Sequence, residues 1–62
     1  MPKHVHKVIT EIVARTGGFV SIKDTIAQVR YVISTSKSDA DLQSEIGTEA
    51  AYQGKPILFD RL

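Results

Sequence analysis

Few side chains of this 62-residue chain could bind a metal ion or transfer a proton. The only histidines are His4 and His6, and there is no cysteine. On a helix, residues two positions apart point about 200° away from each other, so these two imidazoles could not share a metal ion. On an extended segment they would point to the same side, but two ligands without a carboxylate or thiolate make a weak site. We therefore expect solvated histidines and no bound metal.

Three carboxylates recur at intervals of four residues in the second half of the chain. Asp41, Glu45 and Glu49 would line one edge of a helix, where they could bind a cation or dock a basic partner. The simpler interpretation is a solvated helix face, because the helix dipole favours acidic residues near an N-terminus. The serines fall at expected helix caps and in one loop, and Gly17-Gly18 follows a helix instead of opening one as a phosphate-binding loop does. We expect neither an enzyme nor a bound cofactor.

Hydrophobic spacing and cap residues predict three helices that position these side chains. The first runs from about Pro2 to Thr16 and ends at Gly17-Gly18, because glycine adopts the left-handed conformation of a helix terminus at little cost. Its apolar residues recur three and four positions apart and form one face. They are Val5, Val8, Ile9, Ile12 and Val13.

The second and third helices begin with the same Ser-x-x-Asp signal, in which the serine hydroxyl caps the first turn. Ser21 caps a helix that runs to about Thr35, although its many β-branched residues leave a strand as the alternative. Ser38 caps a helix that runs to about Gln53. The expected apolar faces are Ile22, Ile26, Val29 and Ile33 on the second helix and Leu42, Ile46 and Ala50 on the third.

The C-terminal residues Lys55–Leu62 are predicted to be extended, because the residue before a proline avoids the helical region. Along such a segment Ile57 and Phe59 point to one side and Leu58 to the other. A segment this apolar, in a chain short of core, is expected to dock on the helices with Ile57 and Phe59 substantially buried. Pairing with Gly18–Ile22 would make a small two-stranded element.

These elements predict a single domain over residues 1–62 that is mainly α, with three helices and an extended C-terminal segment packed back on them. A chain of this length buries roughly 60% of its unfolded surface, so its stability margin is thin and association is a common remedy. The expected core comprises Val5, Val8, Ile9, Ile12, Val13, Phe19, Ile22, Ile26, Val29, Ile33, Leu42, Ile46, Ile57 and Phe59.

The composition argues against a membrane protein or a general polyanion binder. No apolar stretch approaches the roughly 20 residues that span a bilayer, and the polar N-terminus does not resemble a signal peptide, so we expect a cytoplasmic protein with no membrane partner. The net charge is +1 but unevenly spread. Residues 1–37 carry six Lys or Arg against two acids, and residues 38–62 carry two against five. Such an uneven distribution of charge along the chain can orient a partner or a second copy of the chain.

A DNA-binding regulator is the main alternative function. The second and third helices could form a helix-turn-helix, but the helix in the recognition position holds four acids and no Lys or Arg, which would repel phosphates. A ribbon-helix-helix interpretation takes Phe19–Ile22 as the ribbon and offers only Ser21 and Lys23 as polar contacts to the bases. We therefore do not favour nucleic acid as the partner.

A Gly-x-Val-Ser-x-Lys-x-x-Ile pattern lies between the first two predicted helices, at residues Gly18–Ile26. With the stripe of Val29 and Ile33 and the helix start at Ser38, it resembles small enterobacterial biofilm and acid-resistance regulators over residues 8–51. The resemblance implies a helical homodimer of a small bacterial protein, with a regulatory role and no enzymatic activity. The tail from Pro56 onward departs from the helical ending of that family.

The third predicted helix has a second face made of small residues. Ala40, Ser44, Gly47 and Ala51 fall within about 60° of one another, opposite the core face. Small residues either tolerate solvent or let another helix approach closely. Gly47 costs about 1 kcal/mol relative to Ala in an exposed helix interior, which favours a packed position. We therefore predict a two-fold homodimer in which this helix meets its own copy, with the acidic edge beside the seam.

Tyr31 falls opposite the apolar stripe of the second predicted helix. It is either a singly exposed aromatic side chain or an anchor in an interface. Together these patterns favour a small non-enzymatic protein-interaction module, self-associating and regulatory, over a DNA-binding regulator.

Overall fold

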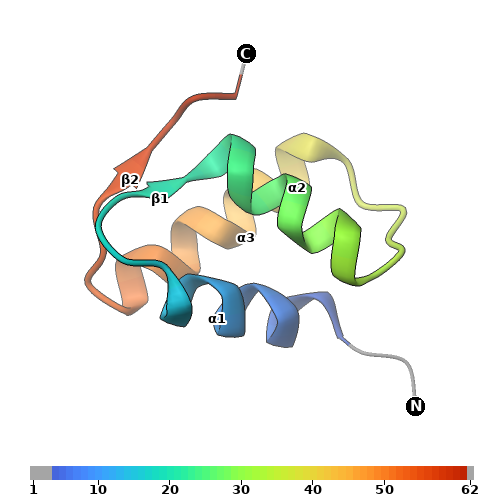
Figure 1. Cartoon of the computed structure of the whole chain (residues 1–62). Coiled ribbons are helices and arrows are strands. Elements are labelled where there is room, and N and C mark those ends of the chain that lie inside the picture. The colour runs from blue at the N-terminus through green and yellow to red at the C-terminus, as the bar shows by residue number, and fades with distance from the viewer. Residues whose placement is uncertain (1–3, 62) are drawn as a thin grey trace.

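The computed structural model describes residues 4–61 as three helices and two short strands (Figure 1). The elements are α1 (Val5–Arg15), β1 (Val20–Ser21), α2 (Ile22–Val32), α3 (Asp39–Tyr52) and β2 (Ile57–Leu58). The two strands are parallel and pair at one end of the bundle, while α3 lies behind α1 and α2 in Figure 1. The predicted fold class is thus confirmed, including the two-stranded element. Within residues 4–61, every helix falls short of the length and apolar character that a membrane crossing needs.

Both predicted serine caps are present. The hydroxyl of Ser21 accepts a hydrogen bond from the backbone N–H of Asp24 at 3.1 Å, and the hydroxyl of Ser38 accepts one from the N–H of Asp41 at 3.1 Å. Each bond satisfies one N–H of a first helical turn, where no carbonyl of the same helix is available. Two residues of the predicted pattern therefore fix where α2 and α3 begin.

The helix ends differ slightly from the prediction. α2 ends at Val32 and not at Thr35, because Ile33 already has an extended backbone. Gly18 and Gly54 have positive φ angles of 76° and 72°, which let the chain reverse after α1 and after α3. The predicted start of the first helix at Pro2 lies outside the described residues.

The core lies where the three helices meet and is built from aliphatic side chains. Two polar residues, Thr25 and Glu49, are also buried. Val20 of β1 is fully buried, although the sequence analysis did not include it in the core. The buried hydrophobic residues are Val8, Ile9, Ile12, Val13, Val20, Ile22, Ile26, Val29, Leu42, Ile46 and Ala50, with Val5, Ile33 and Ile57 half-buried at the edge.

Two members of the expected core, Phe19 and Phe59, are instead exposed, by 66% and 64%. Phe19 directly precedes the buried Val20, and successive residues of a strand point to opposite faces. Phe59 follows β2, where the N–H of Asp60 donates to the carbonyl oxygen two residues earlier at 3.1 Å. The chain turns there, so the alternation expected to bury Phe59 beside Ile57 does not continue. The predicted burial of both phenylalanines is wrong, and Ile57 is half-buried.

The C-terminal segment docks on α3, as predicted. A Cβ placed on Gly47 would lie 4.0 Å from Cδ1 of Ile57, and Nε of Arg61 donates to Oε1 of Gln43 at 2.9 Å. Residue 57 therefore lies beside residue 47, and residue 61 beside residue 43, so the tail runs antiparallel to α3. Gly47 faces the tail of its own chain.

One lysine side chain ties this tail to the end of α1. Nζ of Lys55 donates to the carbonyl oxygens of Val13 at 2.7 Å, Ala14 at 3.0 Å and Thr16 at 2.7 Å. The last carbonyls of a helix have no partner within the helix and carry partial negative charge, so an ammonium group is favourable there. The N–H of Lys55 itself donates to the carbonyl oxygen of Ala50 at 2.8 Å. Lys55 thus joins α1, α3 and the tail.

Replacing this ammonium group should destabilise the whole domain. We expect Lys55→Met to lower the free energy of unfolding by about 2–3 kcal/mol, because hydrogen bonds to a charged donor are lost while the side-chain length is kept. Urea denaturation followed by circular dichroism measures this. Lys7→Met, on the exposed outer face of α1, is the matched control and should change stability by less than about 0.5 kcal/mol. Equal effects of the two variants would contradict the proposed capping role.

The position of Phe59 gives a second test. Phe59→Ala should cost less than about 1 kcal/mol in monomer stability, because the ring is mostly exposed. Ile46→Ala, at a fully buried position of α3, should cost about 2–5 kcal/mol. Thermal and urea unfolding of the two variants at low protein concentration compare them. A larger loss for the phenylalanine would show that its ring packs in the core.

Candidate interaction surface

All four aromatic residues of the chain lie at the surface. The exposed fractions are 66% for Phe19, 92% for Tyr31, 87% for Tyr52 and 64% for Phe59. Aromatic side chains usually supply much of a core, since each buries about 150–250 Å². Here the smaller aliphatic side chains fill the core, and the largest apolar groups remain available for a partner.

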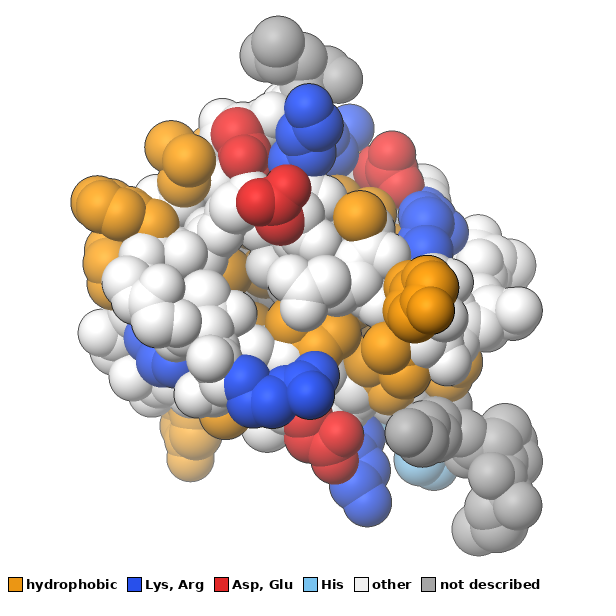
Figure 2. All heavy atoms as spheres, in the orientation of Figure 1, with side chains coloured by type: hydrophobic (Ala, Val, Ile, Leu, Met, Phe, Trp, Pro, Cys, Tyr) orange, Lys and Arg blue, Asp and Glu red, His pale blue; other side chains and the backbone are white. Residues whose placement is uncertain are grey.

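Two of these aromatic residues, Phe19 and Phe59, lie next to the strand pair in the sequence, one before β1 and one after β2. Val20 pairs with Ile57 and faces inward, so its neighbour Phe19 faces outward, together with Leu58. Leu58 is 50% exposed. We define the strand-pair face as Phe19, Leu58 and the following Phe59. Figure 2 shows hydrophobic side chains gathered at the left edge of the molecule, where Figure 1 places β1 and β2.

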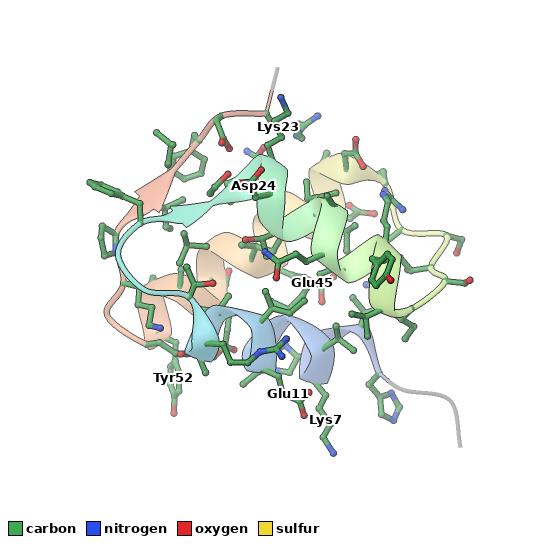
Figure 3. All side chains as sticks on the ribbon, viewed as in Figure 1. Lys7, Glu11, Lys23, Asp24, Glu45 and Tyr52 are labelled. Carbon is green, nitrogen blue, oxygen red and sulfur yellow. The ribbon has the colours of Figure 1, made fainter. Side chains whose placement is uncertain are left out.

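A carboxylate of the tail anchors this face to the start of α2. One oxygen of Asp60 accepts the backbone N–H of Lys23 at 2.8 Å, and the other accepts the hydroxyl of Ser21. The hydrogen bond from the Lys23 N–H, followed by that from Ser21, lowers the pKa of Asp60 below its ordinary value of 3.8. Figure 3 shows Lys23 and Asp24 on the adjoining first turn of α2, where both side chains are exposed. The strand-pair face is therefore bordered by charges of both signs.

The small-residue face predicted on α3 is only partly free. Ala40, Ser44 and Ala51 are exposed, but Gly47 is half-buried against Ile57 of the tail. The packing that the sequence analysis required for Gly47 is therefore supplied within the chain. The exposed small residues remain a predicted contact, as does Tyr31, which protrudes from α2 on the side away from the core.

The predicted acidic edge of α3 is not one solvated face. The side chain of Glu49 is only 8% exposed, and its Oε2 accepts a hydrogen bond from Nε2 of Gln53 at 2.8 Å. Its Oε1 lies 3.7 Å from Nε2 of His6 on α1, close enough for an ion pair when that imidazole is protonated. Nε2 of Gln53 also donates to the carbonyl oxygen of Thr10 at 3.2 Å. The solvated-edge interpretation is wrong for Glu49, because its turn of α3 faces α1.

Two other acids of α3 are paired within the chain. The guanidinium of Arg30 donates to the carboxylate of Asp39, and Nζ of Lys37 lies 3.1 Å from Oε2 of Glu45. Arg30 and Lys37 thus lie against carboxylates of α3 in this fold. Among residues 4–61, no three His, Asp or Glu side chains lie close enough together to hold a metal ion.

Sequence reasoning missed the strand-pair face because it assigned both phenylalanines to the core. The signal that could have found it is the register of the strand pair. Val20 and Ile57 are paired and have β-branched aliphatic side chains, and if they face inward then Phe19 and Leu58 must face outward.

Comparison of the chain with protein-family models, with curated proteins and with solved structures gives no match.

The pKa of Asp60 predicts how acid affects the tail. A carboxylate whose pKa is lowered by folding stabilises the folded state fully above its ordinary pKa of 3.8, and this contribution is lost as the pH falls through the lower folded value. We expect Asp60→Asn to melt at a lower temperature than the wild type at pH 7 and pH 5. This difference in melting temperature should shrink as the pH falls below about 3.8. Thermal melts over this range provide the measurement. A difference in melting temperature that persists at pH 2 would show that the charge of the Asp60 carboxylate does not stabilise the fold.

Proposed function

We propose that this chain is a non-enzymatic protein-interaction module that self-associates as a homodimer and has a regulatory role in the cytoplasm. The observation that carries the proposal is the exposure of all four aromatic side chains around an aliphatic core. Interface anchors are enriched in aromatic residues, which bury large areas on binding. A small domain that leaves these groups in water gains most from a partner that covers them.

The regulatory part of the proposal comes from the sequence. The pattern at residues 18–26 resembles small biofilm and acid-resistance regulators, for which a helical homodimer is implied. The pairing of α3 carboxylates with Arg30 and Lys37 disfavours the alternative, a DNA-binding regulator.

The test is the oligomeric state of the intact chain. Sedimentation velocity over roughly 5–500 µM should show a reversible shift from monomer to dimer, the range expected for an interface of modest size. A monomer throughout this range would overturn self-association.

DNA binding is measured in parallel by gel shift on random duplex at two salt concentrations. We expect no shift. Binding that weakens steeply with salt would support the DNA-binding alternative in place of the proposed function.

A further inference from the structure

We infer that the strand-pair face is the site at which a second copy of the chain docks, about a two-fold axis that passes through this face. This inference rests on the proposed self-association and assigns it to a surface. It arises from the structure, because the sequence pattern alone placed Phe19 and Phe59 in the core.

The apolar area of this face fits the centre of a small interface. Two phenylalanines that are about two-thirds exposed and a half-exposed leucine present roughly 300 Å² of apolar surface. A stable interface buries about 800 Å² per partner, with an apolar centre and a polar rim. That is about a fifth of the 4207 Å² surface of the molecule. The face supplies the centre, and the polar residues around it supply the rim.

The charges of the rim favour a second copy of the same chain. Lys23 and Asp24 are neighbours on the first turn of α2, beside the tail, and neither belongs to an ion pair within residues 4–61. When a face that carries both signs meets its own copy about a two-fold axis, Lys23 can pair with the partner's Asp24 in two equivalent places. A nucleic acid would require a basic rim instead.

A peptide that adds a strand to this sheet would fit the same surface less well than a second copy of the chain. A peptide that extends a sheet gains most of its affinity from backbone hydrogen bonds along an exposed strand edge. Both strands here are only two residues long, and Ser21 of β1 is already the cap of α2. The exposed side chains, and not the strand edges, therefore provide the binding surface.

The α3 face is a weaker candidate for the same contact. Its exposed members Ala40, Ser44 and Ala51 have small side chains that contribute little apolar area, and Gly47 already packs against the tail. It serves as the comparison in the experiment.

The experiment measures the dimerisation constant of the full chain by sedimentation. Phe59→Ser and Phe19→Ser should each weaken dimerisation about tenfold or more. Tyr31→Ser and Tyr52→Ser remove aromatic rings that are more exposed than those of Phe19 and Phe59 and lie outside the strand-pair face, and Ser44→Arg blocks the α3 face. These three controls should leave the constant within about threefold of the wild type. Thermal melts confirm that each variant is folded.

Charge reversal tests the orientation of the two copies. Lys23→Glu and Asp24→Lys should each weaken dimerisation, because every inter-copy pair then joins like charges. The double variant exchanges the signs and should restore dimerisation to within about threefold of the wild type. Failure of the double variant to recover would overturn the two-fold arrangement.

The outcomes separate this inference from the proposed function. A wild-type chain that stays monomeric overturns self-association and this site together. A wild-type dimer that survives Phe59→Ser and Phe19→Ser but is lost in Ser44→Arg keeps the proposed function and moves the interface to α3. Loss in the phenylalanine variants alone, with the controls unchanged, supports the strand-pair face.

Discussion

The position of the C-terminal tail depends on the hydrogen bonds that the ammonium group of Lys55 makes to the end of α1. Its three hydrogen bonds close the C-terminal end of α1 from a residue about 40 positions later in the chain. At the start of α2 the charge is negative: the carboxylate of Asp60 accepts a hydrogen bond from the backbone N–H of Lys23. A cation therefore sits at a helix C-terminus and an anion at a helix N-terminus, each matching the sign of the helix dipole. The two contacts hold the tail across the connector between α1 and α2.

This fixed tail determines the surface. With Lys55 and Asp60 held, the residues between them pair with β1 in a register that turns Val20 and Ile57 toward the helices. A shift by one residue would exchange the two sides, since side chains alternate along a strand. The same register leaves Phe19 and Leu58 in water. Polar contacts at two helix ends thus decide which apolar side chains the molecule presents.

The sequence alone was sufficient to predict the local structure. Apolar spacing and the serines at positions 21 and 38 predicted the helices, and Pro56 with the apolar residues after it predicted a docked tail. The polar contacts of Lys55 and Asp60 join residues 37–42 positions apart, and no periodicity encodes them. Hydrophobicity placed the phenylalanines in the core and charge placed Glu49 in solvent. Both assignments failed because burial depends on how the elements pack. The helical turn that carries Glu49 faces α1, and the backbone around the strand pair leaves both phenyl rings in water.

The shape of the molecule explains why its aromatic residues are outside. The described chain extends 30 × 24 × 16 Å along its principal axes, so it is thinnest along one of them. Such a thin body encloses one layer of side chains, and aliphatic side chains, mostly isoleucine and valine, already occupy it. A phenyl ring forced into that layer would overpack it. The rings can be covered only from outside, so the smallness that limits the core also creates the surface a partner would bury.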